Sequence, residues 1–204
     1  MSHVILACAS DGTAKRNIID KAQRFRHSMV RAHIGWDVQN GTGNDYYDSQ
    51  NPVYVIARND SGTIEGCWRA LPTTGPYMLR DAFPQLMHGQ QAPCSPTIWE
   101  LSCFAVSPAS RNNPAGTFMG ITSSMLRSIY DFALRNGIER YITVTSVGLE
   151  RMIRRVGFSM HRFGPPARIG NTLSVANWTD INDDARRVVD ACKFGSSDSM
   201  HNEK

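Results

Sequence analysis

Two ionisable residues, Arg69 and Glu100, lie inside apolar runs that are typical of buried strands. Arg69 belongs to residues 63–71 and Glu100 to residues 97–106. Burying an ionised side chain costs free energy unless the charge is paired or takes part in chemistry, so both residues are candidates for a functional site. The carboxylate could act as a general base, or the two side chains could form a structural ion pair. The sequence leaves both alternatives open.

The composition excludes several classes of protein. The chain has 22 basic and 18 acidic residues and a net charge of +4, which is too little for wholesale nucleic-acid binding. Its five cysteines form no CxxC pair and no histidine stands at metal-ligand spacing, which indicates a reduced, cytoplasmic, metal-free protein. No apolar run approaches the roughly 18 residues that a membrane span needs.

The hydrophobic periodicity predicts an α/β protein. Helices are expected at residues 13–32, 117–136 and 147–156, and strands at residues 4–8, 53–58, 63–71, 97–106, 140–145, 158–163 and 173–178. Residues 37–52 are rich in turn formers and acids, which predicts a long loop. We expect a single domain over residues 1–192, followed by a polar, disordered tail at residues 193–204.

This order of elements resembles the GNAT-type acyltransferases, and it implies a GNAT-like three-layer α-β-α fold with a central mixed, mostly antiparallel sheet. Those enzymes hold the coenzyme A pyrophosphate on a Gly-rich loop. The matching stretch, residues 107–116, contains one glycine and two prolines, which lack N–H donors. A coenzyme A-dependent N-acetyltransferase is therefore disfavoured, whereas acyl transfer is still expected.

A set of polar and aromatic residues forms a signature known from one enzyme family. Its members are Arg26, Trp36, Asp45, Asp48, Arg69, Phe83 and Glu100. Arg26 and Trp36 keep a ten-residue spacing, the two aspartates form D-x-x-D, and the segments CWRALPTTGPYML and WELS are nearly unaltered. From about residue 20 to residue 180 the chain resembles the LuxI family, the acyl-homoserine lactone synthases of quorum sensing.

The resemblance implies two substrates and no cofactor: S-adenosylmethionine, and an acyl group carried as a thioester on acyl carrier protein. The methionyl α-amine attacks the thioester and forms an amide; the methionyl carboxylate then closes a lactone and expels methylthioadenosine. A free α-amine has a pKa of about 7.7–8.0, so it needs a base at neutral pH. Glu100 is the candidate base, directly or through a water, and Asp45 would assist it or orient the amine.

The resemblance also implies a pocket for S-adenosylmethionine. Its expected residues are Arg26, Val30, Trp36, Asp48, Arg69, Phe83, Cys103 and Phe104. Trp36 would stack on adenine or face the sulfonium, although it could also be a core aromatic, as could Phe83. The two aspartates could instead be ordinary turn residues of their loop.

Two further sites are expected downstream. An apolar acyl tunnel is assigned to Met125, Ile129, Ile142, Val144, Thr145 and Leu149, which could also be ordinary core residues. In the family, a hydroxyl at the position of Thr145 can hydrogen-bond a 3-oxo group of the acyl chain. A basic stripe formed by Arg151, Arg154 and Arg155 would dock the acidic acyl carrier protein, unless it is simply a solvated face.

Two positions depart from the family pattern. Val30 stands where the family has phenylalanine, and Cys103 stands where it has arginine, in WELSRF. Losing an arginine from a buried cluster of acids is expected to leave a carboxylate unpaired, at a cost of about 3–5 kcal/mol. The alternative function is therefore a catalytically impaired homologue that binds S-adenosylmethionine or acyl carrier protein with little turnover. Cys103 itself could accept the acyl group as a nucleophile, or be an inert small residue.

Overall fold

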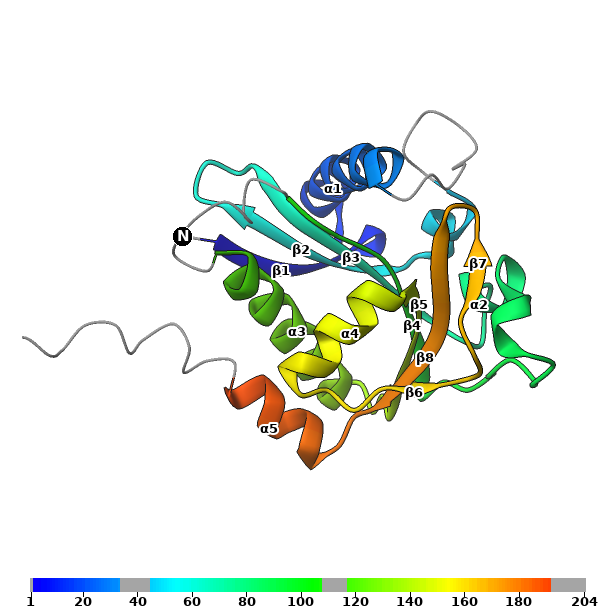
Figure 1. The fold of residues 1–204 in the computed structure, drawn as a ribbon. Helices are drawn as coiled ribbons and strands as arrows, with labels where there is room; N and C mark the ends of the chain where they lie inside the picture. Colours follow the sequence, from blue (N-terminus) through cyan, green and yellow to red (C-terminus); the bar gives the residue numbers. More distant parts are fainter. Residues whose placement is uncertain (1, 34–44, 108–116, 192–204) are drawn as a thin grey trace, which may run out of the picture.

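The computed structural model describes residues 2–33, 45–107 and 117–191. They form one eight-stranded sheet in the order β1-β2-β3-β4-β5-β8-β6, with β7 paired to β8 (Figure 1). The strands are β1 (Ser2–Cys8), β2 (Val53–Asn59), β3 (Ile64–Pro72), β4 (Ile98–Val106), β5 (Arg140–Ser146), β6 (His161–Arg162), β7 (Ala167–Ile169) and β8 (Thr172–Asp180).

All neighbouring strands are antiparallel except β4 and β5, which run parallel. The parallel ladder pairs residues 98–101 with residues 140–143 and then ends, although both strands continue. Beyond that point β4 pairs only with β3, and β5 pairs only with β8, over the described residues. The two central strands therefore part in the middle of the sheet.

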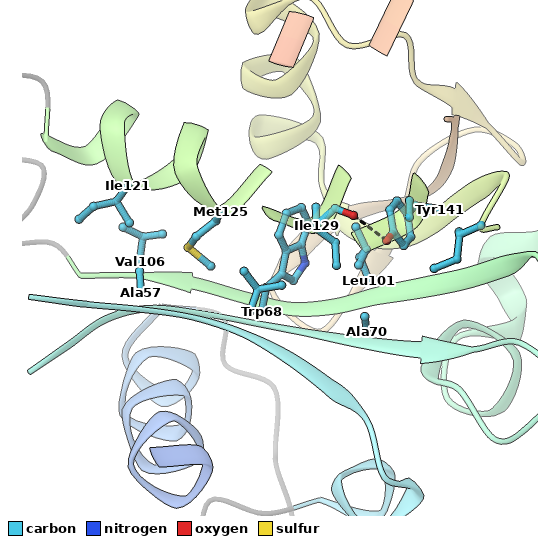
Figure 2. Packing of buried hydrophobic residues seen from close by; sticks show 12 residues of the cluster. Ala57, Trp68, Ala70, Leu101, Val106, Ile121, Met125, Ile129 and Tyr141 are labelled. Atoms are coloured by element: carbon cyan, nitrogen blue, oxygen red, sulfur yellow. Dashed lines mark hydrogen bonds between the residues drawn. The ribbon is translucent and has the colours of Figure 1, made fainter. Parts of the chain in front are cut away.

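Helices cover both faces of the sheet. On one face α1 (Thr13–His33) buries Ile19 and Ala22 against β1–β3. On the other face α3 (Thr117–Arg135) packs Met125 and Ile129 against Trp68 and its neighbours. These α3 residues recur every four positions, which places them on one side of the helix. Figure 2 shows the sheet edge-on, with the green α3 on one side and the blue α1 on the other.

The remaining helices are shorter. They are α2 (Met78–Asp81), α4 (Val147–Val156) and α5 (Asp183–Ala191), with 3-10 turns at η1 (Ala9–Asp11), η2 (Tyr46–Gln50) and η3 (Pro84–Met87). α4 begins at Ser146, whose Oγ accepts the Leu149 N–H at 3.2 Å, and ends at Gly157, whose φ of +112° favours glycine. An apolar cluster joins α3, α4 and α5, so these three helices share one face of the sheet.

The predicted α/β class and three-layer architecture are confirmed, and the differences are local. α5 was not predicted, because its short apolar face gains its partners, Tyr130 and Phe158, only through tertiary packing. The strand expected at 158–163 is reduced to β6, and a 3-10 turn, η2, lies in the expected loop. The expected tail lies outside the described residues. Among the described helices, none combines the length and apolar content of a membrane-spanning segment.

Candidate active site

A buried carboxylate, Asp48, is the hub of a polar cluster. Its Oδ1 accepts hydrogen bonds from Arg26 Nη1 at 2.9 Å, from Arg69 Nη1 at 2.8 Å and from the Tyr54 hydroxyl. Its Oδ2 accepts from Arg26 Nη2 at 2.6 Å. Arg26 comes from α1, Tyr54 from β2 and Arg69 from β3, whereas Asp48 belongs to η2. One carboxylate therefore ties a helix and two strands to the loop.

Asp45 and Asp48 cap their own turn reciprocally. Asp45 Oδ1 accepts the Asp48 N–H at 3.1 Å, and Asp48 Oδ2 accepts the Asp45 N–H at 2.8 Å. This capping box requires the three-residue separation of D-x-x-D. Asp45 Oδ1 also accepts from Arg69 Nη1, and the Asp45 side chain is 18% exposed whereas that of Asp48 is 3% exposed. The aspartates thus serve as turn residues and as partners of the arginines at the same time.

The guanidinium of Arg69 is fully buried and contacted on every side. Its Nε donates to Ser102 Oγ at 3.1 Å. Its Nη2 lies 3.0 Å from Met78 Sδ and 3.6 Å from Cys103 Sγ. Its Cζ lies 5.4 Å from the centroid of the Tyr47 ring, within the range of a cation–π contact. These contacts hold the planar group in one orientation beneath η2.

Opposite charges offset the cost of burial in this cluster. Burial by itself would raise the pKa of Asp48, but the hydrogen bonds and charge of Arg26, together with the charge of Arg69, lower it well below the ordinary 3.8. Burial would likewise lower the pKa of Arg26, yet its bonds to Asp48 raise it instead. Burial and the charge of Asp48 raise the pKa of Tyr54, which therefore remains a hydrogen-bond donor. Arg26, Arg69 and Asp48 are therefore ionised at neutral pH, and their charges stabilise one another.

Glu100 is fully buried on β4 and is held by the first turn of α2. Its Oε2 accepts the Met78 N–H at 2.9 Å, and its Oε1 accepts the Leu79 N–H at 2.7 Å. Burial raises its pKa above the ordinary 4.5, although the two backbone N–H groups and the charge of Arg69 act in the opposite direction. Among the described residues Arg69 pairs with Asp45 and Asp48 and not with Glu100, so the alternative of a structural Arg69–Glu100 ion pair is not found. Its role as a base stays a prediction.

A β-bulge places Cys103 in the site. The β3–β4 register shifts here, so that Cys103 and Phe104 both lie opposite Trp68, and Cys103 has a φ of +60°, in the left-handed region. The bulge directs the Cys103 side chain toward Arg69 and sends Phe104 to the other face of the sheet. There the Phe104 ring packs on Trp68, with 5.0 Å between ring centroids.

The expected consequence of Cys103 is not found. Asp45 and Asp48 are paired with Arg26 and Arg69, and Glu100 is bound by backbone N–H groups. Every one of these described carboxylates has a partner without an arginine at position 103. The predicted unpaired carboxylate is therefore wrong, because two arginines already serve both aspartates.

A cavity of about 320 Å³ lies beside the cluster, between α1 and η2. Its lining includes Arg16, Asp20, Gln23, Asp45, Asp48 and Tyr54. Its volume falls within the range of small-molecule pockets, roughly 300–1,000 Å³. Over the described residues, no group of three or more histidine, cysteine or acidic side chains is arranged to hold a metal ion.

A family model described as autoinducer synthase matches residues 11–189, most of the chain. This chain belongs to the autoinducer synthase family. An acyl-homoserine-lactone synthase of Pseudomonas aeruginosa is 37% identical over 171 residues, which cover 82% of this chain and 84% of that protein. The crystal structure of the AHL synthase LasI matches with a TM-score of 0.83 at 34% identity, over 93% of this chain and 94% of that one. The predicted family and enzyme class, an acyltransferase of the acyl-homoserine-lactone synthase type, are confirmed.

More distant structures share the fold alone. BjaI, a coenzyme A-dependent acyl-homoserine lactone synthase solved with SAM and isopentyl-CoA, matches with a TM-score of 0.78 at 24% identity, over 95% of this chain and 89% of that one. FeeM, an N-acyl amino acid synthase from uncultured soil microbes, matches with a TM-score of 0.60 at 13% identity, over 90% of this chain and 98% of that one. The predicted GNAT-like architecture of this synthase is thus shared with other N-acyltransferases.

The structure brings together only part of the expected S-adenosylmethionine pocket. Arg26, Asp45, Asp48, Arg69 and Cys103 form one cluster. Phe104 is not part of this cluster, and Phe83 adjoins it through α2, where its N–H donates to the Met78 carbonyl at 3.1 Å.

Phe104 packs on the opposite face of the sheet, which the bulge explains. Phe83, at the start of η3, packs against the apolar cluster of Tyr77 and Leu79. Trp36 and the side chain of Val30 lie outside the described residues.

The six expected acyl-tunnel residues do not share one wall. Met125 and Ile129 belong to the cluster beneath α3, whereas Ile142 and Val144 belong to the cluster on the other face. Thr145 lies on the opposite face from its neighbour Val144, because consecutive residues of a strand point to opposite faces. Leu149 is half-buried on α4. The expected acyl-tunnel residues of the sheet and α3 therefore lie on both faces of the sheet.

The basic stripe on α4 is also divided. Arg154 Nε donates to Glu150 Oε1 at 3.1 Å, and its guanidinium also donates to the Met160 carbonyl. Glu150 is fully buried and is bound by Arg162 as well, so Arg154 has a structural partner one turn earlier on its own helix. Arg151 and Arg155 are exposed and have no ion pair among the described residues. Arg154 is exposed as well, at 44%, but it is held by Glu150.

Five residues of the cluster were not predicted, among them Ser102, whose Oγ accepts from Arg69 Nε. Gln23 Nε2 donates to the Tyr54 hydroxyl at 2.9 Å, which in turn donates to Asp48. Tyr47 and Met78 contact Arg69. Tyr54 could have been found, since it lies in an apolar run directly opposite Arg69 in the β2–β3 hairpin. Nothing in the sequence marked Met78 as a site residue, because its contact with Arg69 depends on where α2 lies in the folded chain.

Proposed function

We propose that this synthase makes an acyl-homoserine lactone from S-adenosylmethionine and an acyl thioester delivered by acyl carrier protein, and releases methylthioadenosine. The observation that carries the proposal is the buried Arg26–Asp48–Arg69–Asp45 cluster beside a cavity of about 320 Å³. A rigid site with charges of both signs suits a substrate that carries an ammonium, a sulfonium and a carboxylate.

Asp45 is the cluster member that meets the substrate. Its side chain is partly exposed, it lines the cavity, and its Oδ2 has no hydrogen-bond partner among the described residues. Asp45 would bind the methionyl ammonium and orient it. Arg69 holds Asp45 in place, so the amine is positioned with little loss of freedom at the moment of reaction.

The first step transfers the acyl group to this amine. The ammonium loses a proton, its nitrogen attacks the thioester carbon, and the thiol leaves. Glu100 would take the proton through a water, because its carboxylate is fully buried against the α2 backbone. The strand edge of β4 beyond residue 101 has no partner on β5, so its backbone N–H groups suit the developing oxyanion.

The second step closes the lactone. The methionyl carboxylate oxygen attacks its own γ-carbon, the carbon–sulfur bond breaks, and methylthioadenosine leaves as a neutral thioether. The reaction needs no further base, since the sulfonium already makes the carbon electrophilic. The site contributes positioning, which a cluster fixed by four buried side chains supplies.

Acyl carrier protein is the proposed acyl donor. The exposed Arg151 and Arg155 lie one turn apart on α4, which packs on β5 and β8 beside the place where β4 and β5 part. Their unpaired positive charges complement an acidic carrier protein. The competing acyl donor is a coenzyme A thioester, which would not need a basic docking surface on α4.

The decisive experiment supplies the purified protein with S-adenosylmethionine and one acyl chain, carried either on acyl carrier protein or on coenzyme A. We expect methylthioadenosine and an acyl-homoserine lactone, measured by liquid chromatography and mass spectrometry, at a higher kcat/KM with the carrier protein. A higher kcat/KM with the coenzyme A thioester would overturn the proposal that acyl carrier protein is the acyl donor. Substrate binding without lactone from any donor would instead support the catalytically impaired homologue.

A further inference from the structure

A fully buried amide, Asn177 on β8, has no hydrogen-bond partner for either of its polar atoms. Its relative exposure is 0%, and both Nδ2 and Oδ1 are unsatisfied. The hydroxyl of Thr145, 6% exposed on the neighbouring strand β5, is unsatisfied as well. Buried polar side chains are nearly always paired, so two such residues on adjacent strands require an explanation.

The strand register places these groups on one face of the sheet. Asn177 lies directly opposite Thr143, and Thr145 follows two residues later on the same strand. Tyr141 shares this face, and its hydroxyl donates to the Ile129 carbonyl of α3 at 2.9 Å (Figure 2). Because alternate strand residues share a face, Asn177 and Thr145 both lie on the side covered by α3 and α4.

The same register places the amide near the reacting centre. Thr143, opposite Asn177, is the last β5 residue that pairs with β4 before the two strands part. An acyl chain that reaches the cluster through this gap would pass Asn177 close to its thioester end. The core residues Met125 and Ile129 on this side of the sheet are apolar, so the amide is a polar exception along such a path.

We propose that Asn177, on the same face of the sheet as Thr145, is a specificity-determining residue that recognises a hydroxyl group near the thioester end of the acyl chain. A hydroxyl can accept from Nδ2 and donate to Oδ1, which satisfies both atoms of the amide at once. A keto oxygen only accepts, so it leaves Oδ1 unpaired. An unsubstituted chain satisfies neither atom. This inference rests on the proposed function.

The test compares wild type with Asn177→Leu, which keeps the volume and removes both polar atoms. Each protein receives S-adenosylmethionine and acyl carrier protein loaded with a 3-hydroxyacyl, 3-oxoacyl or unsubstituted chain of the same length. We expect wild type to favour the 3-hydroxyacyl chain over the unsubstituted chain by about tenfold to a hundredfold in kcat/KM, the range set by one unsatisfied buried group. In Asn177→Leu this ratio should fall to about one or below.

Two controls separate specificity from folding. Thr179→Val changes a half-buried threonine on the same face of β8 and should leave the ratio unchanged. Asn177→Leu should also raise the melting temperature, because it removes an unsatisfied amide. Lactone formation with the same ratio in wild type and Asn177→Leu would overturn the inference and assign the amide to a buried water. Absence of lactone from every donor would instead overturn the proposed function, and this inference with it.

Discussion

Glu100 accepts the backbone N–H of Leu79 at 2.7 Å and, through its other oxygen, that of the preceding residue. The carboxylate therefore fixes the first turn of α2, and through it the position of Met78 against Arg69. If Glu100 is the base, replacing it should slow the chemical step without changing the binding of S-adenosylmethionine. If Glu100 is a positioning residue, replacing it should weaken both.

Glu100→Gln separates these roles. If Glu100 is the base, acylation should fall by about 10²-fold or more, while the Kd for S-adenosylmethionine stays within about threefold. Single-turnover acylation and calorimetric binding measure the two quantities. An equal loss in both would show that Glu100 only positions α2.

The pH dependence of stability provides an independent test of the buried carboxyl group. Because burial raises the pKa of Glu100 above 4.5, the folded protein keeps this proton to a higher pH than the unfolded chain does. Wild type should therefore lose stability as the pH rises from 4.5 through the folded pKa, whereas Glu100→Gln lacks this loss. The difference in melting temperature, variant minus wild type, should grow between pH 4.5 and pH 8. A constant difference would contradict a raised pKa.

Asp48→Asn should destabilise the fold strongly. The change removes the buried negative charge that Arg26 and Arg69 both bind, at an expected cost of about 3–5 kcal/mol in the free energy of unfolding. Asp184→Asn is the matched control, since Asp184 pairs with Arg187 at the surface, is 68% exposed, and should cost only about 0–1 kcal/mol. Denaturant titration measures both. Because the pKa of Asp48 is lowered, its contribution should be complete above pH 3.8 and be lost only as the pH falls further.

Cys103→Arg tests whether this copy is impaired. Since the described carboxylates are already paired, we expect the substitution to change kcat/KM by less than about threefold. The added guanidinium would also lie near Arg69, whose Nη2 is 3.6 Å from the present Sγ. A gain of tenfold or more in lactone formation would support the alternative of a damaged synthase.

Arg151→Glu and Arg155→Glu should each raise the KM for acyl carrier protein, by about fivefold or more at low salt, and the effect should shrink as salt increases. The same variants should leave turnover of a coenzyme A thioester unchanged. Arg154→Ala should behave differently: it removes one partner of the buried Glu150 and should lower stability more than carrier-protein binding. Equal effects of all three changes on KM would contradict this division of the stripe.

The predictions from sequence succeeded where a local rule applies. The D-x-x-D spacing of Asp45 and Asp48 matches a capping box, which depends only on residues three positions apart. The apolar periodicity of α3 and α4 likewise located both helices to within a few residues. The acyl-tunnel residues do not share one face, because strand alternation sends Ile142 and Thr145 to opposite faces, and their role stays a prediction; only the paired sheet shows which helices cover each face.

By itself, the sequence indicated the fold class through its hydrophobic periodicity, and it indicated the family and the arginine and aspartate residues of the site through its resemblance to the LuxI signature. Only the tertiary structure decided which groups the buried and charged side chains bind. Glu100 binds the α2 backbone and not Arg69, Arg154 binds Glu150 although it is exposed, and Asn177 is buried without a hydrogen-bond partner for its side chain. The physical reason is that a hydrogen bond depends on a few ångströms between residues far apart in the chain. Those distances are set by strand register, by the bulge at Cys103 and by the place where β4 and β5 part.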